Sequence, residues 1–217
     1  MKRPFLVLFC LCLLGEPVTA KTTTEYQTWL AAGARVPLLK NTDLDVIALQ
    51  KSNTTITDIY QVYPKVSLSY RVHRYLRLET GTRYAFEFDE GERDRRLRFF
   101  QDIGTGSPAL WLFKVGYRFR FQQTHEENED KWTPKLRNKL SLSASVSPYF
   151  KPGIYYEHFL DLSETQENMS ADYRLGLSIG SRITRAHRLK LKLFQNTELN
   201  GDDDKERVLS LSYHHYF

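Results

Sequence analysis

The sequence predicts an all-β protein: a transmembrane, antiparallel, up-and-down β-barrel of ten strands, with twelve as the other count. Three observations predict it. From about residue 56 to the end, apolar residues recur at every second position, the period of a strand, and no stretch carries a helical apolar stripe. Short and long polar connections alternate between these runs. After residue 20 no window holds about 18 consecutive apolar residues, which excludes membrane-spanning helices.

The expected strands follow one another from residue 29 onward. The first two, 29–36 and 44–49, alternate least regularly, and the clearest run is 109–121, with Trp111, Phe113 and Val115 on one face. The literal count is eleven, but single-chain bacterial barrels have an even number. Either the count is wrong by one or residues 21–35 do not span the membrane, and ten strands are preferred over twelve. The other expected strands are 66–72, 76–88, 97–103, 136–146, 154–160, 173–183, 189–193 and 209–217.

The connections between these runs are of two kinds. Short turns at one end of a barrel and longer loops at the other are typical of outer-membrane barrels. The sequence therefore predicts that successive strands reverse direction across a membrane. Short connections are expected at 72–74, 104–108, 147–148 and 184–187, and long polar ones at 89–93, 122–133, 163–170 and 200–205.

Residues 1–20 have the parts of a secretory signal peptide. Two basic residues follow the first methionine, residues 5–14 are apolar but too short to span a bilayer, and residues 18–20 are small at the cleavage position. We expect cleavage before Lys21, which leaves one barrel domain, 21–217. Both cysteines of the chain would be removed, so the exported protein would contain no disulfide.

Alternation defines two faces without saying which is buried. A membrane barrel puts the apolar face outside, whereas a soluble secreted β-barrel that binds an apolar ligand puts it inside. The polar face mixes basic residues with glycine and serine, as a narrow lumen with long and short side chains requires. We therefore assign it to the lumen. Its basic residues are Arg77, Arg83, Arg96, Arg98, Lys114, Arg118, Arg120, Arg137, Lys139, Arg174, Arg182, Arg188, Lys190 and Lys192, and its acidic residues are Glu79, Asp102 and Glu157.

A basic lumen predicts one of two roles. Cationic linings favour anions in pores, so the barrel would be a narrow channel for small anionic solutes. Alternatively, arginines and carboxylates would form a hydrogen-bonded plug that closes a structural barrel. With ten strands the interior is barely wider than its side chains, which favours the plug. The basic residues are spread over alternate strand positions rather than gathered on one patch, so nucleic acid is not an expected partner.

Catalytic chemistry has little support in the sequence. An envelope-lipid hydrolase would need a serine activated by a histidine, and only Ser212 and His214 share a strand face at close spacing. No acid accompanies them, so we expect no enzyme activity and no catalytic residue. The sequence has no metal-ligand motif and no phosphate-binding glycine loop, and we expect neither a metal nor a cofactor.

The last strand carries an expected assembly signal. Tyr213 and the final Phe217 lie on the apolar face. This resembles the C-terminal signature of bacterial outer-membrane barrels, which is recognised by the barrel-assembly machinery. The resemblance implies that this machinery and outer-membrane lipids are partners.

A wider resemblance covers most of residues 26–217. It is carried by Trp29-Leu30, Gly81-Thr82-Arg83-Tyr84, Gly116-Tyr117-Arg118-Phe119-Arg120 and Ser147-Pro148-Tyr149, in that order. The chain resembles a family of predicted outer-membrane β-barrels of unknown function in Gram-negative bacteria. This implies the fold and the location and supplies no activity. The small basic-lumen oligosaccharide porins are similar in style only.

The expected location can be tested by fractionation. With a signal peptide and an apolar exterior, the processed chain should sediment with the outer membrane and need detergent for extraction. Immunoblotting of separated envelope fractions measures this. Recovery of the processed chain in the soluble periplasm would contradict the prediction.

Overall fold

The computed structural model describes residues 24–89, 92–128, 131–162, 171–198 and 205–217. The predicted signal peptide lies outside them. The described residues form eleven strands and hold no helix long and apolar enough to cross a membrane. The strands are β1 Thr24–Leu39, β2 Thr42–Ser52, β3 Ile59–His73, β4 Leu76–Asp89, β5 Glu92–Gly106, β6 Phe113–Glu126, β7 Trp132–Ala144, β8 Lys151–Asp161, β9 Ala171–Arg182, β10 His187–Glu198 and β11 Lys205–Tyr216.

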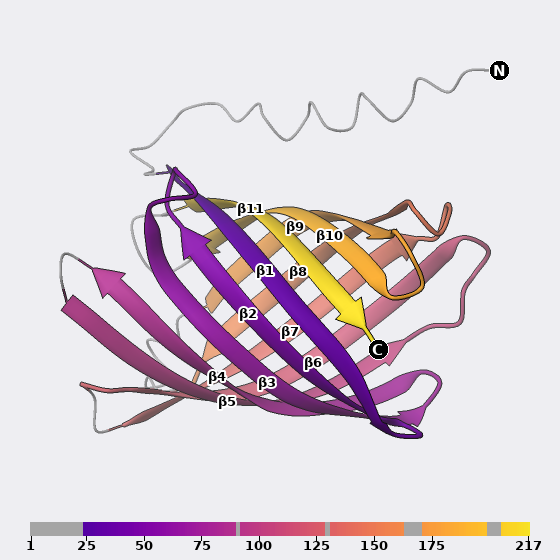
Figure 1. The fold of residues 1–217 in the computed structure, drawn as a ribbon, viewed down its shortest axis with the longest axis horizontal. Coiled ribbons are helices and arrows are strands. Elements are labelled where there is room, and N and C mark those ends of the chain that lie inside the picture. Colours follow the sequence, from indigo (N-terminus) through magenta and orange to yellow (C-terminus); the bar gives the residue numbers. More distant parts are fainter. Residues whose placement is uncertain (1–23, 90–91, 129–130, 163–170, 199–204) are drawn as a thin grey trace.

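The strands close into one barrel in chain order, with β1 and β11 side by side (Figure 1). Ten neighbouring pairs are antiparallel. The closing pair is parallel, with partners from Thr24 and Lys205 to Arg35 and Tyr216. The all-β barrel predicted from the sequence is therefore confirmed, with this one parallel contact added to it.

The predicted count of ten or twelve strands is wrong, because the described residues form eleven. An even number is needed only when the first and last strands meet antiparallel, and here they run side by side in the same direction. Residues 24–35 belong to β1 and form part of the wall. Their alternation was weak because Trp29 packs inside the barrel against Phe194 while Leu30 follows it on the other face.

Several strands are longer than their apolar runs. The connection predicted at 122–133 is an example, since β6 continues to Glu126 and β7 begins at Trp132. Gln122 and Thr124 are polar but buried inside the barrel, so this part of β6 shows no apolar alternation. The expected loop is therefore shorter than the polar composition indicated.

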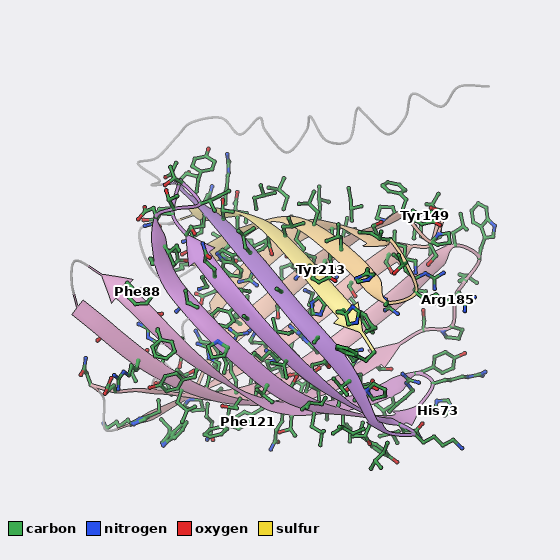
Figure 2. The ribbon with its side chains drawn as sticks, viewed as in Figure 1. His73, Phe88, Phe121, Tyr149, Arg185 and Tyr213 are labelled. Atoms are coloured by element: carbon green, nitrogen blue, oxygen red, sulfur yellow. The ribbon has the colours of Figure 1, made fainter. Side chains whose placement is uncertain are left out.

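The two ends of the barrel differ. The turns after β1, β3, β5, β7 and β9 lie together at one end, called here the turn end, where β11 also finishes. Figure 2 shows His73, Tyr149 and Arg185, from three of these turns, at that end and Phe88 at the other. The other end, called the loop end, is where β1 begins.

The apolar face is outside. Large hydrophobic side chains are exposed around the whole wall, as with Leu68 on β3, Ile103 on β5, Leu140 on β7, Leu175 on β9 and Leu193 on β10. Residues between them in sequence, such as Ser67, are buried in the interior. This is the arrangement of a membrane barrel, and the soluble ligand-binding alternative required the reverse.

Leu193→Arg tests whether this face meets lipid or water. Leu193 is 53% exposed and lies near the middle of β10. In a bilayer the substitution should cost about 2–4 kcal/mol of unfolding free energy near the midplane, whereas an exposed site in water would lose only about 0.5 kcal/mol. Urea unfolding in phospholipid vesicles measures the cost, and Leu193→Ala controls for the lost side chain. Equal stability of the two variants would contradict a lipid-facing wall.

Candidate functional site in the barrel interior

The interior holds a buried carboxylate surrounded by cations. Glu157 of β8 is only 1% exposed. Its carboxylate accepts hydrogen bonds from Arg118 (2.6 Å) and Arg137 (2.8 Å). Lys139 and Arg174 lie 3.8 Å from its other oxygen. Four cations from β6, β7 and β9 therefore share one carboxylate, so this part of the interior has an excess of positive charge.

The sheet register brings these groups together. Glu157 is directly opposite Lys139 on β7 and Arg174 on β9. Opposite residues of antiparallel strands point to the same face, and residues two apart along a strand share that face. Arg137 lies two residues before Lys139, so it also points inward. Arg118 is opposite Lys139 and reaches Glu157 across β7.

A second buried ion pair extends the cluster to β5. Arg120 donates two hydrogen bonds to Asp102, at 2.5 and 2.6 Å, and both residues are buried. This bidentate geometry is the strongest form of the arginine–carboxylate contact. The Arg120 guanidinium also lies 4.2 Å from the ring centre of Phe100. Arg118, 3.9 Å from Asp102, connects this pair to Glu157.

The charged groups continue around the wall toward β1. Lys65 lies 4.8 Å from the ring centre of Phe100 and donates to Glu79 at 2.7 Å. Arg77 lies 3.8 Å from Glu79 and donates to Asp45 of β2 at 3.2 Å. Arg35 of β1 donates to the same Asp45 at 2.6 Å. Each of the four carboxylates described, on Glu157, Asp102, Glu79 and Asp45, therefore contacts at least two cations.

Aromatic side chains fill the space beside these ions. Tyr155, Phe194 and Val208 form a buried cluster against which Trp29 packs, and Val208 is 0% exposed. The Arg174 guanidinium lies 4.5 Å from the ring centre of Phe194 and 5.5 Å from that of Trp29. The ions, the rings and Val208 together, called here the interior network, draw residues from all eleven described strands.

Gly176 of β9 makes room for these rings. A Cβ atom at this position would lie 2.6 Å from the Tyr155 ring and 2.7 Å from the Cβ of Phe194. Real Cβ contacts are never that short, so a larger residue would push both rings away. Glycine inside a strand often marks such a close approach.

The predicted basic residues divide into two groups of seven. Within the described part of the chain, the first group contacts a carboxylate: Arg77, Arg96, Arg118, Arg120, Arg137, Lys139 and Arg174. The second group has no ion pair with a described carboxylate. Its members are Arg83, Arg98, Lys114, Arg182, Arg188, Lys190 and Lys192.

Some of the second group have other partners. Arg98 donates to the Thr124 hydroxyl at 2.9 Å, and Arg83 lies over the Tyr63 ring. Arg188, near the turn end, lies over the Tyr216 ring. Lys114 and Lys190 are exposed to solvent although they alternate with outward apolar residues. The interior is therefore open to water toward the turn end and densely filled around Glu157.

Sequence reasoning missed several members of the network. Asp43 and Asp45 lie two positions apart and so share one face of an otherwise apolar strand. This pattern could have predicted that both point into the barrel. Glu87, which pairs with Arg96 and hydrogen-bonds Gln61, shares the parity of Glu79. The inward aromatic rings could also have been predicted, because their positions alternate with those of the outward apolar residues. They are Trp29, Tyr63, Phe100, Tyr155, Phe159 and Phe194.

The candidate serine–histidine pair is not joined. The Ser212 hydroxyl donates to the backbone carbonyl of Lys190 at 3.3 Å. The described residues show no hydrogen bond between Ser212 and His214. His215 points to the other face, where its Nδ1 lies 3.5 Å from Nδ1 of His187. These contacts join β10 to β11, and the Ser212 hydroxyl is directed to a backbone carbonyl rather than to a histidine.

The two expected assembly residues lie at the turn end. Tyr213 and Nδ1 of His187 are 2.6 Å apart in a hydrogen bond between β11 and β10. Phe217 is exposed, its ring packs edge-on against His215, and its backbone N–H donates to the Arg35 carbonyl at 3.1 Å. Both residues therefore help to hold the end of β11 between its two neighbouring strands.

The fold and the interior place this protein in the class of closed β-barrels that have an apolar exterior and a charged interior. The chain belongs to the family described as Protein of unknown function (DUF2490), which matches residues 26–207. No curated protein matches the sequence.

Two solved structures are similar in fold. One is an anion-selective porin from Comamonas acidovorans, with 11% identity, a TM-score of 0.40, and coverage of 82% of this chain and 54% of the porin. The other is LpxR from Salmonella typhimurium, with 10% identity, a TM-score of 0.48, and coverage of 83% and 84%. The chain thus spans about half the length of the porin, and the likeness concerns the fold alone.

Glu157→Gln should strongly destabilise the barrel. It leaves four cations without their shared carboxylate, and breaking a buried pair in this way costs about 3–5 kcal/mol. The matched control is Glu126→Gln at the loop end, where the carboxylate is partly exposed and pairs with Arg96 at 3.1 Å. That pair should be worth about 0–1 kcal/mol. Urea unfolding of both variants in vesicles measures the difference, and equal losses would show that the interior is solvated.

Proposed function

We propose that this protein is an outer-membrane β-barrel whose interior is closed, in its resting form, by the interior network. The outer-membrane location is supported by the apolar exterior, by the signal peptide predicted for residues 1–20 and by the resemblance of the last strand to barrel-assembly signals. Outer-membrane lipids and the assembly machinery are the partners that such a chain requires. The role of the barrel in this proposal is structural.

The burial of Glu157 carries the proposal of closure. An inward carboxylate in a water-filled pore would be solvated, yet Glu157 is 1% exposed, and Asp102 and Arg120 of the same network are also buried. Phe100, Tyr155 and Phe194 are each less than a tenth exposed, although they too point inward. Water therefore has little access to these carboxylates and rings, which supports a filled interior around Glu157.

The same contacts make spontaneous opening costly. To open a path, arginines would have to leave Glu157 and Asp102 while those carboxylates stayed in the barrel. An unpaired buried charge costs several kcal/mol. The aromatic cluster would also lose its packing, since Trp29 and Phe194 meet edge-to-face with ring centres 5.1 Å apart.

A second candidate function is a narrow channel for small anionic solutes. One observation favours it: Lys114, Lys190 and Lys192 point inward and have no ion pair with a described carboxylate. Charges in a confined space attract counter-ions more strongly than charges on an open surface. An anion would be drawn into the turn end of the interior, but the interior network would have to move before it could pass.

Planar-bilayer conductance separates the two functions. The wild-type barrel should show no steady conductance. Tyr155→Ala combined with Phe194→Ala should open an anion-selective current, because it removes the rings and leaves the cations. The matched control removes one tyrosine and one phenylalanine from the outside, Tyr156→Ala with Phe99→Ala, and should stay closed.

Each outcome decides between the proposals. Steady, anion-selective conductance of the wild type would overturn closure and favour the channel. In that case Lys190→Ser with Lys192→Ser should reduce the anion preference. A folded double variant of the interior rings that still does not conduct would show that the ion network alone closes the barrel.

A further inference from the structure

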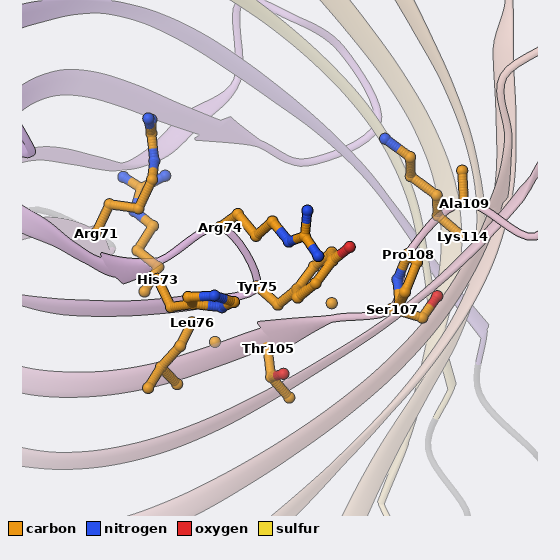
Figure 3. A pocket seen from close by; sticks show the side chains of 13 residues that line it. Arg71, His73, Arg74, Tyr75, Leu76, Thr105, Ser107, Pro108, Ala109 and Lys114 are labelled. Atoms are coloured by element: carbon orange, nitrogen blue, oxygen red, sulfur yellow. The ribbon is translucent and has the colours of Figure 1, made fainter.

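A pocket of about 480 Å³ lies at the turn end, between the β3–β4 turn and the β5–β6 connection. Its size is within the range of small-molecule sites. Its lining holds four cationic side chains, Arg71, Arg74, Arg77 and Lys114, and no carboxylate. Figure 3 shows Arg71 and Lys114 on opposite sides of the pocket, with Arg74 alongside the Tyr75 ring between them.

Three of these cations are available to a ligand. Arg77 is engaged with Asp45 at 3.2 Å. Arg71 and Lys114 have no ion pair with any carboxylate among the described residues, and Arg74 is held over the Tyr75 ring at 4.7 Å. An uncompensated group of two guanidinium groups and one ammonium is suited to an anion with several oxygen acceptors. Arginine in particular matches phosphate in a bidentate manner.

The backbone holds the pocket walls in place. The N–H of Gly106 donates to the Tyr75 carbonyl at 3.0 Å and joins the two connections. The N–H of Ser107 donates to the Val115 carbonyl at 2.8 Å, and the Ser107 hydroxyl accepts from the Val115 N–H at 3.0 Å. The pocket is therefore formed before any ligand binds, which lowers the entropy cost of binding.

The pocket also adjoins an exposed apolar projection. Leu110 and Trp111, directly after the lining residue Ala109, are 82% and 83% exposed. Trp111 has a φ of 58°, a left-handed conformation that is unfavourable for a large residue. Leu110 and Phe113 close this turn with two backbone hydrogen bonds. Tryptophan is enriched at membrane–water interfaces, where one part of its ring is wet and the other apolar.

We infer that this rim pocket binds the phosphate ester of an anionic ligand, through Arg71, Arg74 and Lys114. A phosphate ester occurs both in lipid headgroups and in free metabolites such as glycerol phosphate. The neighbouring Leu110 and Trp111 favour the lipid source, because acyl chains would lie beside them. The three proposed contacts are not members of the interior network, which reaches the pocket only at Arg77. The site therefore stands whether the barrel is closed or conducts.

The test uses the refolded protein in a maltoside detergent and follows thermal unfolding, since a ligand that binds only the folded state raises the Tm. Three probes are titrated: short-chain phosphatidylglycerol, short-chain phosphatidylcholine and glycerol 3-phosphate. The variant is Arg71→Gln, Arg74→Gln and Lys114→Gln together. Its matched control removes three turn-end cations elsewhere on the rim, by Lys151→Gln, Arg182→Gln and Arg185→Gln.

Phosphatidylglycerol should raise the Tm of the wild type and of the control in a saturable manner. The pocket variant should bind about tenfold more weakly or worse. Glycerol 3-phosphate acting as strongly as the lipid would identify a free phosphate ester as the ligand, whereas its failure with the lipid active would identify the headgroup. Phosphatidylcholine, which has no net charge, should act weakly.

Two results would overturn the inference. The first is equal loss in the pocket and control variants, which would reflect rim charge rather than a site. The second is the lack of a saturable shift with any probe. If the triple variant does not fold, as judged by heat-modified mobility in gels, Ala109→Trp fills the pocket without removing a charge and should weaken the lipid effect alone.

Discussion

The parallel contact between β1 and β11 is the constraint on which the rest of the structure depends. A barrel with an apolar exterior has no water at its wall to satisfy a free strand edge, and each unpaired backbone group in lipid costs several kcal/mol. Twelve residue pairs, from Thr24 with Lys205 to Arg35 with Tyr216, remove both edges. The same register places Trp29 against Phe194 across β11, while the antiparallel register of β1 with β2 places Arg35 beside Asp45.

Closing eleven strands creates a second constraint, because the inward side chains must share a narrow space. Most of the charged ones are cations, and like charges repel strongly where water is scarce. The structure meets this by sharing carboxylates: Glu157 serves four cations, and Asp45 serves Arg35 and Arg77. Aromatic faces take further guanidinium groups, as Phe194 does for Arg174. Small residues such as Gly176 provide the remaining room.

Much of this could be predicted from the sequence, because alternation with period two is a direct consequence of strand geometry. The strands and the common face of Arg118, Arg120 and Glu157 follow from parity, and the basic, glycine- and serine-rich composition of that face assigns it to the lumen. The literal count of eleven matched the strands observed, but it was set aside for an even number, since the parallel pairing of β1 with β11 leaves no pattern in either strand. The inward rings were missed for another reason. Tyr155 and Phe194 occupy positions of the polar face, but they are aromatic. A search for alternating polar and apolar residues therefore does not identify them as inward.

Different residues of the interior would determine whether the barrel is closed and which charge it prefers, two properties that the same residues usually determine in a pore. In the proposed function, closure depends on buried groups, namely the aromatic rings and the carboxylates of Glu157 and Asp102. Charge preference depends on cations such as Lys190 and Lys192, which lie in the more open part of the interior and have no ion pair with a described carboxylate. Because the two sets touch at few points, a substitution in one should leave the other largely intact. In the proposed function, the barrel attracts anions at its turn end without conducting them, and the interior network determines whether an attracted anion goes further.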